Sequence, residues 1–118
     1  MLTHEAQMDL LVRKVVEVLT EKIEKEVPAE GSFERIGVRY HHPESEFRGI
    51  LSLEEDLVRA GHCRLNASMF LLGDDKLVSN YLMKGTRQEI LNYLNQEETI
   101  PELIGIFEHL KEKVENLD

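Results

Sequence analysis

Apolar residues recur at helical spacing in the first quarter of the chain and predict a helix over residues 4–26. At 100° per residue they fall within one arc of about 160°. The members of this arc are Met8, Leu11, Val12, Val15, Val16, Val18, Leu19 and Ile23. Thr3 is the expected N-cap, and Pro28 ends the segment. Because the arc is wider than one contact with a sheet requires, the helix should touch two surfaces, within the monomer or across a dimer.

Alternation of apolar and polar residues predicts four strands in the middle of the chain. They cover residues 33–40, 46–51, 62–72 and 76–84. A turn over residues 41–45 joins the first two, and Gly73-Asp74-Asp75 joins the last two as a hairpin. The residues expected to share a face are Leu65, Ala67, Met69 and Leu71 in the third strand, and Leu77, Ser79, Tyr81 and Met83 in the fourth.

A short helix is predicted between the second and third strands. Residues 52–55 read Ser-Leu-Glu-Glu, the Ser-x-x-Glu pattern of a capping box, and Gly61 follows at the right distance to end a helix. This pattern predicts a helix over residues 53–60, although eight residues are few enough for the neighbouring sheet to override them.

Two more capping boxes predict the closing helices. Residues 86–89 open a helix that runs to about Asn95, and residues 99–102 open a last helix over 100–117. The last helix has one apolar arc, formed by Leu103, Ile104, Ile106, Phe107, Leu110, Val114 and Leu117. The opposite, polar side holds Gly105, Glu108, His109, Glu112 and Asn116.

This order of elements predicts one α+β domain over residues 1–118. The expected architecture is an antiparallel four-stranded sheet with a long N-terminal helix and two C-terminal helices. No family's diagnostic residues stand in the chain. In size, acidity and order of elements it is similar to class I secretion chaperones, which implies a dimer that binds protein, but the two closing helices depart from that pattern.

The charge is strongly acidic and unevenly placed. The chain carries 14 basic and 23 acidic side chains, a net charge of −9 at pH 7, and the excess is concentrated in residues 85–118. No basic run occurs, and five arginines are scattered through the middle third: Arg35, Arg39, Arg48, Arg59 and Arg64. Since nucleic acids and anionic membranes attract clustered basic residues, neither is an expected partner. The acidity therefore indicates a solvated surface or a partner with a basic face.

No cofactor and no metal site are expected. Neighbours in extended chain point to opposite sides, so His41 and His42 do not chelate one ion together, even with Glu44 and Glu46 nearby. The motifs of nucleotide binding and of common hydrolases are absent.

The sequence also gives little support for a catalytic residue. Cys63, the single cysteine, follows His62, but a lone strand cysteine is typically a small buried hydrophobe, and it has no internal disulfide partner. The acidic cluster at 54–56 is explained by a helix start, and the acidic pair at 74–75 is explained by a turn. Whether the protein is an enzyme stays open, with a non-catalytic role favoured.

Three functions remain. The leading hypothesis is a cytoplasmic protein without a signal peptide or membrane span, which binds protein as a homodimer through apolar helix residues Val12, Val16, Leu19 and Ile23. The second is a small-molecule binder or enzyme with an anion pocket formed by Arg39, Tyr40, His41 and Arg48. The third is an immunity or inhibitor protein that masks a basic site with Glu97, Glu98 and Glu102.

Overall fold

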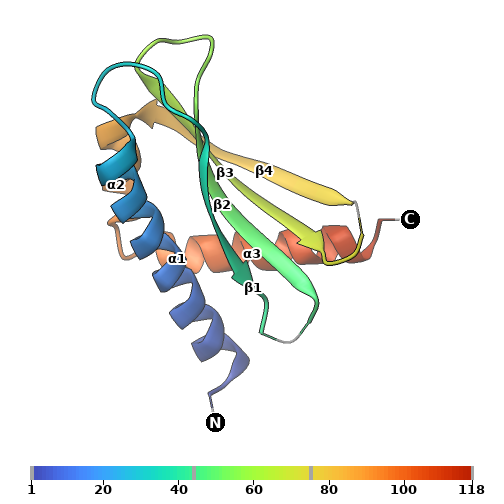
Figure 1. Ribbon diagram of the computed structural model, residues 1–118. Helices are drawn as coiled ribbons and strands as arrows, with labels where there is room; N and C mark the ends of the chain where they lie inside the picture. The colour runs from blue at the N-terminus through green and yellow to red at the C-terminus, as the bar shows by residue number, and fades with distance from the viewer. Residues whose placement is uncertain (1, 44, 75, 118) are drawn as a thin grey trace.

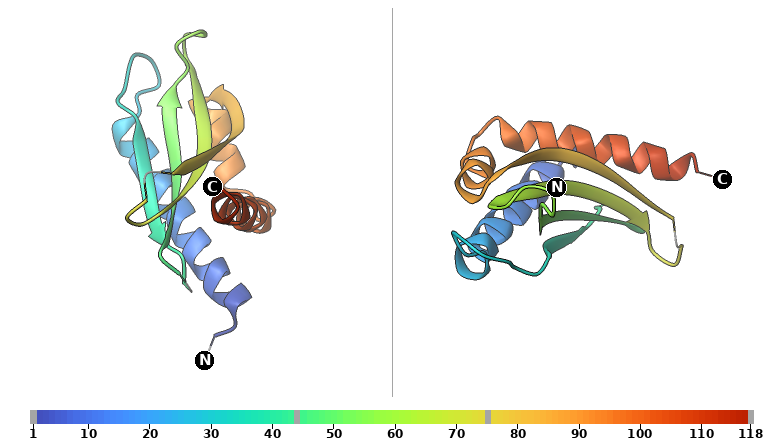
Figure 2. Two further views of the ribbon diagram at one scale, coloured as in Figure 1. Left: turned by 90° about the vertical axis from the view of Figure 1, so that its right-hand side faces the viewer. Right: turned by 90° about the horizontal axis from the view of Figure 1, so that it is seen from above.

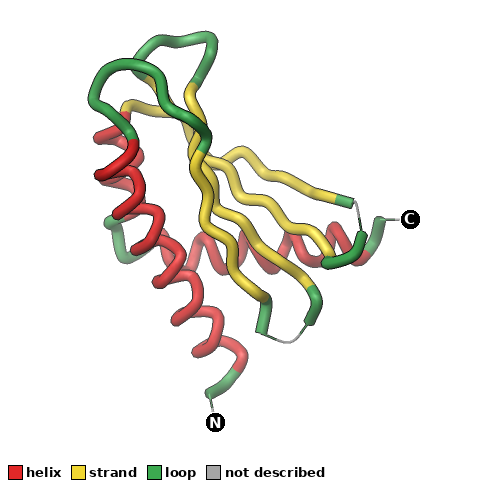
Figure 3. Tube along the Cα trace, viewed as in Figure 1, coloured by secondary structure: helices red, strands yellow, loops and turns green. Residues whose placement is uncertain are grey.

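A long helix, four consecutive strands and two closing helices follow one another in the computed structural model, which describes residues 2–43, 45–74 and 76–117 (Figures 1 and 3). The elements are α1 (His4–Glu26), β1 (Ile36–His41), β2 (Phe47–Glu55), β3 (His62–Leu71), β4 (Leu77–Thr86), α2 (Arg87–Leu94) and α3 (Thr99–Glu115). The α+β architecture expected from the sequence is confirmed. Glu44 in the first expected turn and Asp75 in the hairpin lie outside the described residues.

The sheet is an antiparallel meander with the strand order β1-β2-β3-β4. Chain neighbours are thus sheet neighbours, and each pair is joined by a short connection or turn. Val38 pairs with Leu51, and Leu51 pairs with Ala67, so one row of apolar side chains crosses three strands. This row faces the helices and forms the middle of the hydrophobic core.

The helices cover one face of this sheet. In Figure 1 α3 runs behind the strands and α1 lies along the β1 side, and Figure 2 shows the same layers from two further directions. The ring of Tyr40 on β1 meets the ring of Phe107 on α3 edge-on, with 5.0 Å between centroids. None of the described helices combines the length and the hydropathy needed to cross a bilayer.

The wide apolar arc of α1 is used inside the monomer. Its buried members contact the sheet, α2 and α3, and they are Met8, Val12, Val15, Val16, Leu19 and Ile23. The hydroxyl of Thr3 accepts the N–H of Ala6, which confirms the expected N-cap. The two surfaces that this helix was expected to touch, the sheet and the other helices, both belong to the same chain.

The helix predicted over residues 53–60 is wrong. β2 continues to Glu55 because its pairing with β3 continues, with Leu53 opposite Leu65 and both side chains fully buried. Ser52 therefore lies within a strand, where its hydroxyl accepts a bond from Arg35 rather than capping a helix. A helix here would have broken the ladder and exposed Leu53, so the sheet overrides the local capping signal.

The two closing helices differ at their starts. At α2 the Thr86 hydroxyl accepts the N–H of Glu89 and the Glu89 carboxylate accepts the N–H of Thr86, which confirms that capping box. At α3 the expected cap is wrong, because Thr99 is already helical. Its hydroxyl donates to the carbonyl of Tyr93 instead and ties the helix back to α2.

A β-bulge changes the facing of β4. Leu65 pairs with Met83 but Asn66 pairs with Tyr81, so Leu82 is an extra residue on β4. Leu77, Ser79 and Tyr81 share one face of the sheet, as predicted. Beyond the bulge the alternation reverses, and Met83 turns to the helix side, where it packs against the core.

Candidate functional site

The sheet face opposite the helices is open, and we call it the open face. The register aligns its side chains in four rows across β1, β2, β3 and β4. The rows are His41, Arg48, Phe70, Leu77; then Arg39, Ile50, Ser68, Ser79; then Gly37, Ser52, Asn66, Tyr81; and finally Glu54, Arg64, Lys84. Arg35 directly precedes β1 and reaches this face, where it donates to the hydroxyl of Ser52. Segments spread over about fifty residues of sequence therefore form one surface.

This face is cationic in an acidic protein. Of the residues that the structure describes, it holds Arg35, Arg39, Arg48, Arg64 and Lys84 against one carboxylate, Glu54. Among the described residues, none of these five cations forms an ion pair with a carboxylate. Glu54 accepts instead from the amide of Asn66, at 3.2 Å.

The cations rest on neutral groups of the face. Arg39 lies over the ring of Phe70, with 5.6 Å from the guanidinium carbon to the centroid. Arg64 and Lys84 both lie 5.8 Å from the ring centre of Tyr81. Cation–π contacts at such distances hold the charges in place without neutralising them. The Nε of Arg64 is buried and has no hydrogen-bond partner within the described part of the chain.

A hollow opens at the β1 edge of this face. It has a volume of about 280 Å³ and is lined by Arg35, Ile36, Gly37, Arg39 and Ile50. Gly37 has no side chain, so the space between the two arginines stays open. Two guanidinium groups beside such a space suit a small anion or a carboxylate of a larger ligand.

Charges of both signs lie beyond the ends of the open face. Glu46, Asp74 and Lys76 lie at one end, and Glu34 and Arg59 lie at the other. The cationic area on the strands themselves is short. Three strand spacings of about 4.8 Å and six residues of about 3.3 Å make it roughly 14 by 20 Å.

The four residues predicted to form an anion pocket lie on two different faces of the sheet. Arg39, His41 and Arg48 lie on the open face, with His41 and Arg48 directly opposite each other in the β1–β2 pair. Tyr40 points the other way, into the core beside Phe107. Sequence reasoning missed Arg64 and Lys84 as neighbours of this group, because strand alternation alone does not tell which strands pair or in which register.

The apolar residues predicted as an interaction surface lie in the core. Val12, Val16, Leu19 and Ile23 are all buried, so a partner does not reach them while α1 stays packed. Glu97, Glu98 and Glu102 lie exposed where the α2–α3 connection enters α3.

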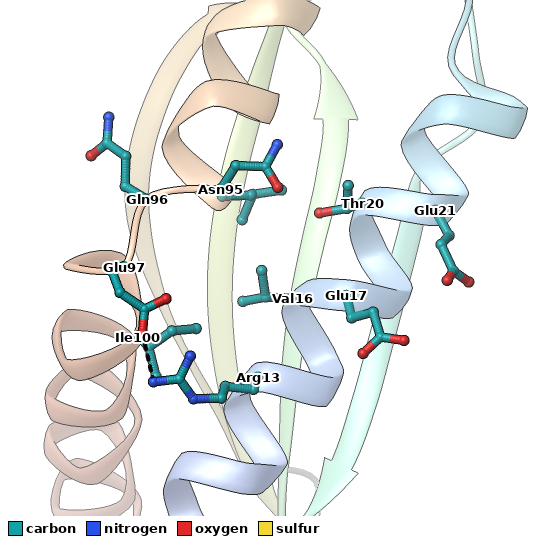
Figure 4. A pocket seen from close by; sticks show the side chains of 10 residues that line it. Arg13, Val16, Glu17, Thr20, Glu21, Asn95, Gln96, Glu97 and Ile100 are labelled. Carbon is teal, nitrogen blue, oxygen red and sulfur yellow. Dashed lines mark ion pairs between the residues drawn. The ribbon is translucent and has the colours of Figure 1, made fainter.

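One of these acids closes a cavity between α1 and the α2–α3 connection (Figure 4). Arg13 bonds Glu97 at 2.9 Å and Asp9 at 2.7 Å, and both hydrogen bonds raise the pKa of the guanidinium. The same contact lowers the pKa of Glu97. The cavity has a volume of about 330 Å³, and Thr20 and Asn95 lie on its opposite sides. Glu97 is thus partly used in joining α1 to the connection.

Cys63 does not have the environment of a nucleophile. Its side chain is only 4% exposed, and burial, followed by the charge of Glu55, raises the pKa of the thiol. A raised pKa leaves the unreactive thiol form at neutral pH. This agrees with the reading of Cys63 as a small core residue.

Comparison with protein-family models, with curated proteins and with solved structures found no match for this chain. The residues of the chain itself are therefore the evidence for its function. Among them, the set of cations on the open face points most strongly to a binding site.

Proposed function

We propose that this α+β protein is a non-catalytic binding module whose open face holds a short acidic segment of a partner protein. The observation that carries the proposal is the gathering, on one face of a protein with net charge −9, of five cations that form no ion pair with a carboxylate of residues 2–43, 45–74 or 76–117. An acidic segment supplies the missing partners, and complementary charge fixes its position.

The size of the face favours a short segment over a long polyanion. Beyond its ends acids and bases are mixed, with Glu46, Asp74 and Lys76 at one end and Glu34 and Arg59 at the other, so the array of cations does not continue along a nucleic acid strand that leaves the face. The net charge of the whole molecule also repels an approaching polyanion at long range. A segment of six to eight extended residues covers about 20–26 Å and ends where the cations end.

Apolar side chains on the same face add to the fit. Leu77 and Tyr81 of β4 are about half exposed, and Ile50 and Phe70 lie beside them, partly buried. An acidic segment with one or two apolar residues would bury this surface while its carboxylates meet the arginines. Burial of this kind supplies affinity, and the charges supply orientation.

Binding of a fluorescent octaglutamate peptide, followed by anisotropy at low salt, tests the proposal. We expect saturable binding that weakens as salt screens the charges. The double variant Arg39→Glu/Arg64→Glu should weaken it at least tenfold. The matched control is Lys113→Glu, which reverses an exposed charge on α3, on the helix side of the sheet.

Any of four results would contradict this proposal. The first is no binding of octaglutamate at low salt, and the second is an equal loss in the Lys113→Glu control. The third is tighter binding of an eight-nucleotide single strand of thymidines, because it would make the face a nucleic-acid surface. If phosphate alone at low millimolar concentration saturates the Arg35–Arg39 hollow and displaces the peptide, the small-anion reading takes its place.

We also keep the homodimer as a proposal. The first argument for a dimer was the apolar arc of α1, and the monomer itself buries that arc. The large apolar side chains that remain exposed come from several elements and connections. They are Leu2, Leu10, Leu57, Val58, Leu72, Leu77, Tyr81 and Leu117. Sedimentation equilibrium across a hundredfold range of concentration tests it. A mass that stays at 13.7 kDa contradicts the dimer without affecting the open face.

The alternative proposal is a basic partner at Glu97, Glu98 and Glu102. Glu97 already bonds Arg13, and Glu102 accepts the hydroxyl of Tyr93 at 3.0 Å, so two of the three acids have internal partners. Octalysine distinguishes the alternatives. The acidic site replaces the open face if octalysine binds, if neutralising these three acids weakens octalysine binding, and if octaglutamate does not bind.

A further inference from the structure

Three side chains from distant parts of the chain meet on the helix side of the sheet. His4 is the first residue of α1, His42 follows β1, and Glu108 lies in the middle of α3. The Nε2 atoms of both histidines lie 3.2 Å from the same oxygen, Oε1 of Glu108. The ligand atoms of all three residues lie within 4.8 Å of one another. Helical periodicity alone predicts Glu108 on the polar side of its helix, and no local pattern singles out His4.

The two nitrogen-to-oxygen separations suit a zinc ion. Zn²⁺ binds imidazole nitrogen at about 2.0–2.1 Å and carboxylate oxygen at about 2.0–2.2 Å, and tetrahedral geometry then separates the ligand atoms by roughly 3.3–3.4 Å. The two nitrogen-to-oxygen distances are close to that value. Two histidines and one glutamate are also a donor set found at zinc sites that keep one position open.

The surroundings of His42 fit a ligand held in place. Its side chain is 1% exposed, although it belongs to a connection between strands. Its other ring nitrogen, Nδ1, lies 3.4 Å from the hydroxyl of Ser45. Histidines that bind metals typically use the second nitrogen for such a contact, which orients the ring. His41, its neighbour, points to the open face and does not take part.

Tyr40 provides an independent observation. Its hydroxyl is buried and has no hydrogen-bond partner within residues 2–43, 45–74 and 76–117. Its ring packs against Phe107, the residue that directly precedes Glu108 in α3. Buried polar groups are normally satisfied by protein or by ordered water, and water carried by a metal ion is one such partner.

A cavity adjoins this cluster and leaves room for a fourth ligand. Its volume is about 510 Å³, and its lining includes His4, Met8, Ile104, Pro101 and Glu108. His4 and Glu108 are each about one-third exposed, so an ion has access from solvent. The cluster therefore has a buried side, formed by His42, and a side open to the cavity.

We propose that His4, His42 and Glu108 bind one Zn²⁺ ion, with a fourth position open to the adjoining cavity. This site is separate from the open face, which lies on the other side of the sheet. Its competitor is a purely structural role, in which Glu108 joins the two histidines by hydrogen bonds and so connects α1, β1 and α3.

Titration of the full chain, stripped of metal with a chelator, tests the site. Zn²⁺ is added in competition with a chromophoric chelator, and we expect one ion per chain. His4→Ala and Glu108→Gln should each weaken binding at least a hundredfold. These two positions are partly exposed, so the variants should fold, and circular dichroism checks that they do; His42→Ala is left out because it opens a buried space.

The neighbouring histidines provide matched controls. His41→Ala and His109→Ala remove exposed imidazoles next to the ligands in sequence, and both should bind Zn²⁺ as the parent chain does. Co²⁺ in place of Zn²⁺ should give the strong visible bands of a four-coordinate ion, lost in Glu108→Gln. The proposal is overturned if the parent chain binds no stoichiometric Zn²⁺. It is also overturned if His4→Ala and Glu108→Gln lower stability but leave Zn²⁺ affinity unchanged, since that is the structural role.

Discussion

The ring of Tyr40 lies directly over Gly49, its partner in the β1–β2 pair. A Cβ atom built on Gly49 would lie 2.1 Å from Cε1 of Tyr40, well inside van der Waals contact. The glycine therefore provides the space in which the ring packs against Phe107 of α3. Through this contact β1 is joined to the last helix of the chain.

Gly49→Ala is expected to destabilise the protein. The new methyl group forces the buried Tyr40 ring away from Phe107, and overpacking of this kind costs about 1–3 kcal/mol. Urea unfolding followed by circular dichroism measures the loss. Gly37→Ala, on β1, is the matched control, because its Cβ would make only ordinary contacts at 3.5 Å. Equal effects of the two substitutions would show that the ring does not depend on the glycine.

Gly105→Ala is expected to stabilise the protein. Gly105 is an exposed residue inside α3, and a Cβ added there meets nothing within 4 Å. Alanine restricts the unfolded chain and favours the helix, which is worth up to about 1 kcal/mol. A rise in the thermal unfolding midpoint measures the gain. An unchanged or lower midpoint would contradict the open surroundings of this residue.

The capping box of α2 is expected to weaken in acid. Accepting the backbone N–H of Thr86 lowers the pKa of Glu89 in the folded protein. Because the folded pKa lies below the unfolded one, the contribution of Glu89 is present above the unfolded pKa and is lost as pH falls through the folded pKa. Unfolding free energies of the parent chain and Glu89→Gln should therefore differ at neutral pH and converge in acid. A difference that is constant with pH would contradict this linkage.

Thr86→Ala tests the other half of the same box. Loss of the side-chain acceptor for the N–H of Glu89 should cost about 1 kcal/mol of unfolding free energy at neutral pH. Thr99→Ala is a comparison of a different kind, since that hydroxyl donates to the carbonyl of Tyr93 and caps no helix N-terminus. Only the Thr86 variant should reduce the pH dependence that Glu89 causes.

The thiol of Cys63 is expected to react slowly. It is buried, and its raised pKa leaves little thiolate near neutral pH. Alkylation by iodoacetamide should be at least tenfold slower in the native protein than in the chain unfolded by urea. Rapid alkylation of the native protein would show an accessible, activated cysteine and would reopen the question of catalysis.

The elements of this fold were readable from local sequence because their signals are local. The period of apolar residues identified α1 and α3, and alternation identified β3. A capping box involves only four successive residues, which is why the Thr86 box was recognised correctly. The same local reasoning failed at Ser52, where pairing with a neighbouring strand decides the conformation and a four-residue pattern does not contain that information.

The arrangement of side chains in space was decided by tertiary structure alone. Register determines that Arg39, Arg48 and Arg64 share one face, and the bulge at Leu82 determines that Met83 does not join them. The meeting of His4, His42 and Glu108 requires α1, β1 and α3 to pack together across up to 104 residues of sequence. Sequence by itself determined the order and type of most elements, because these follow from interactions between near neighbours. Packing decided which charges and ligands meet, because that depends on contacts between residues far apart in the chain.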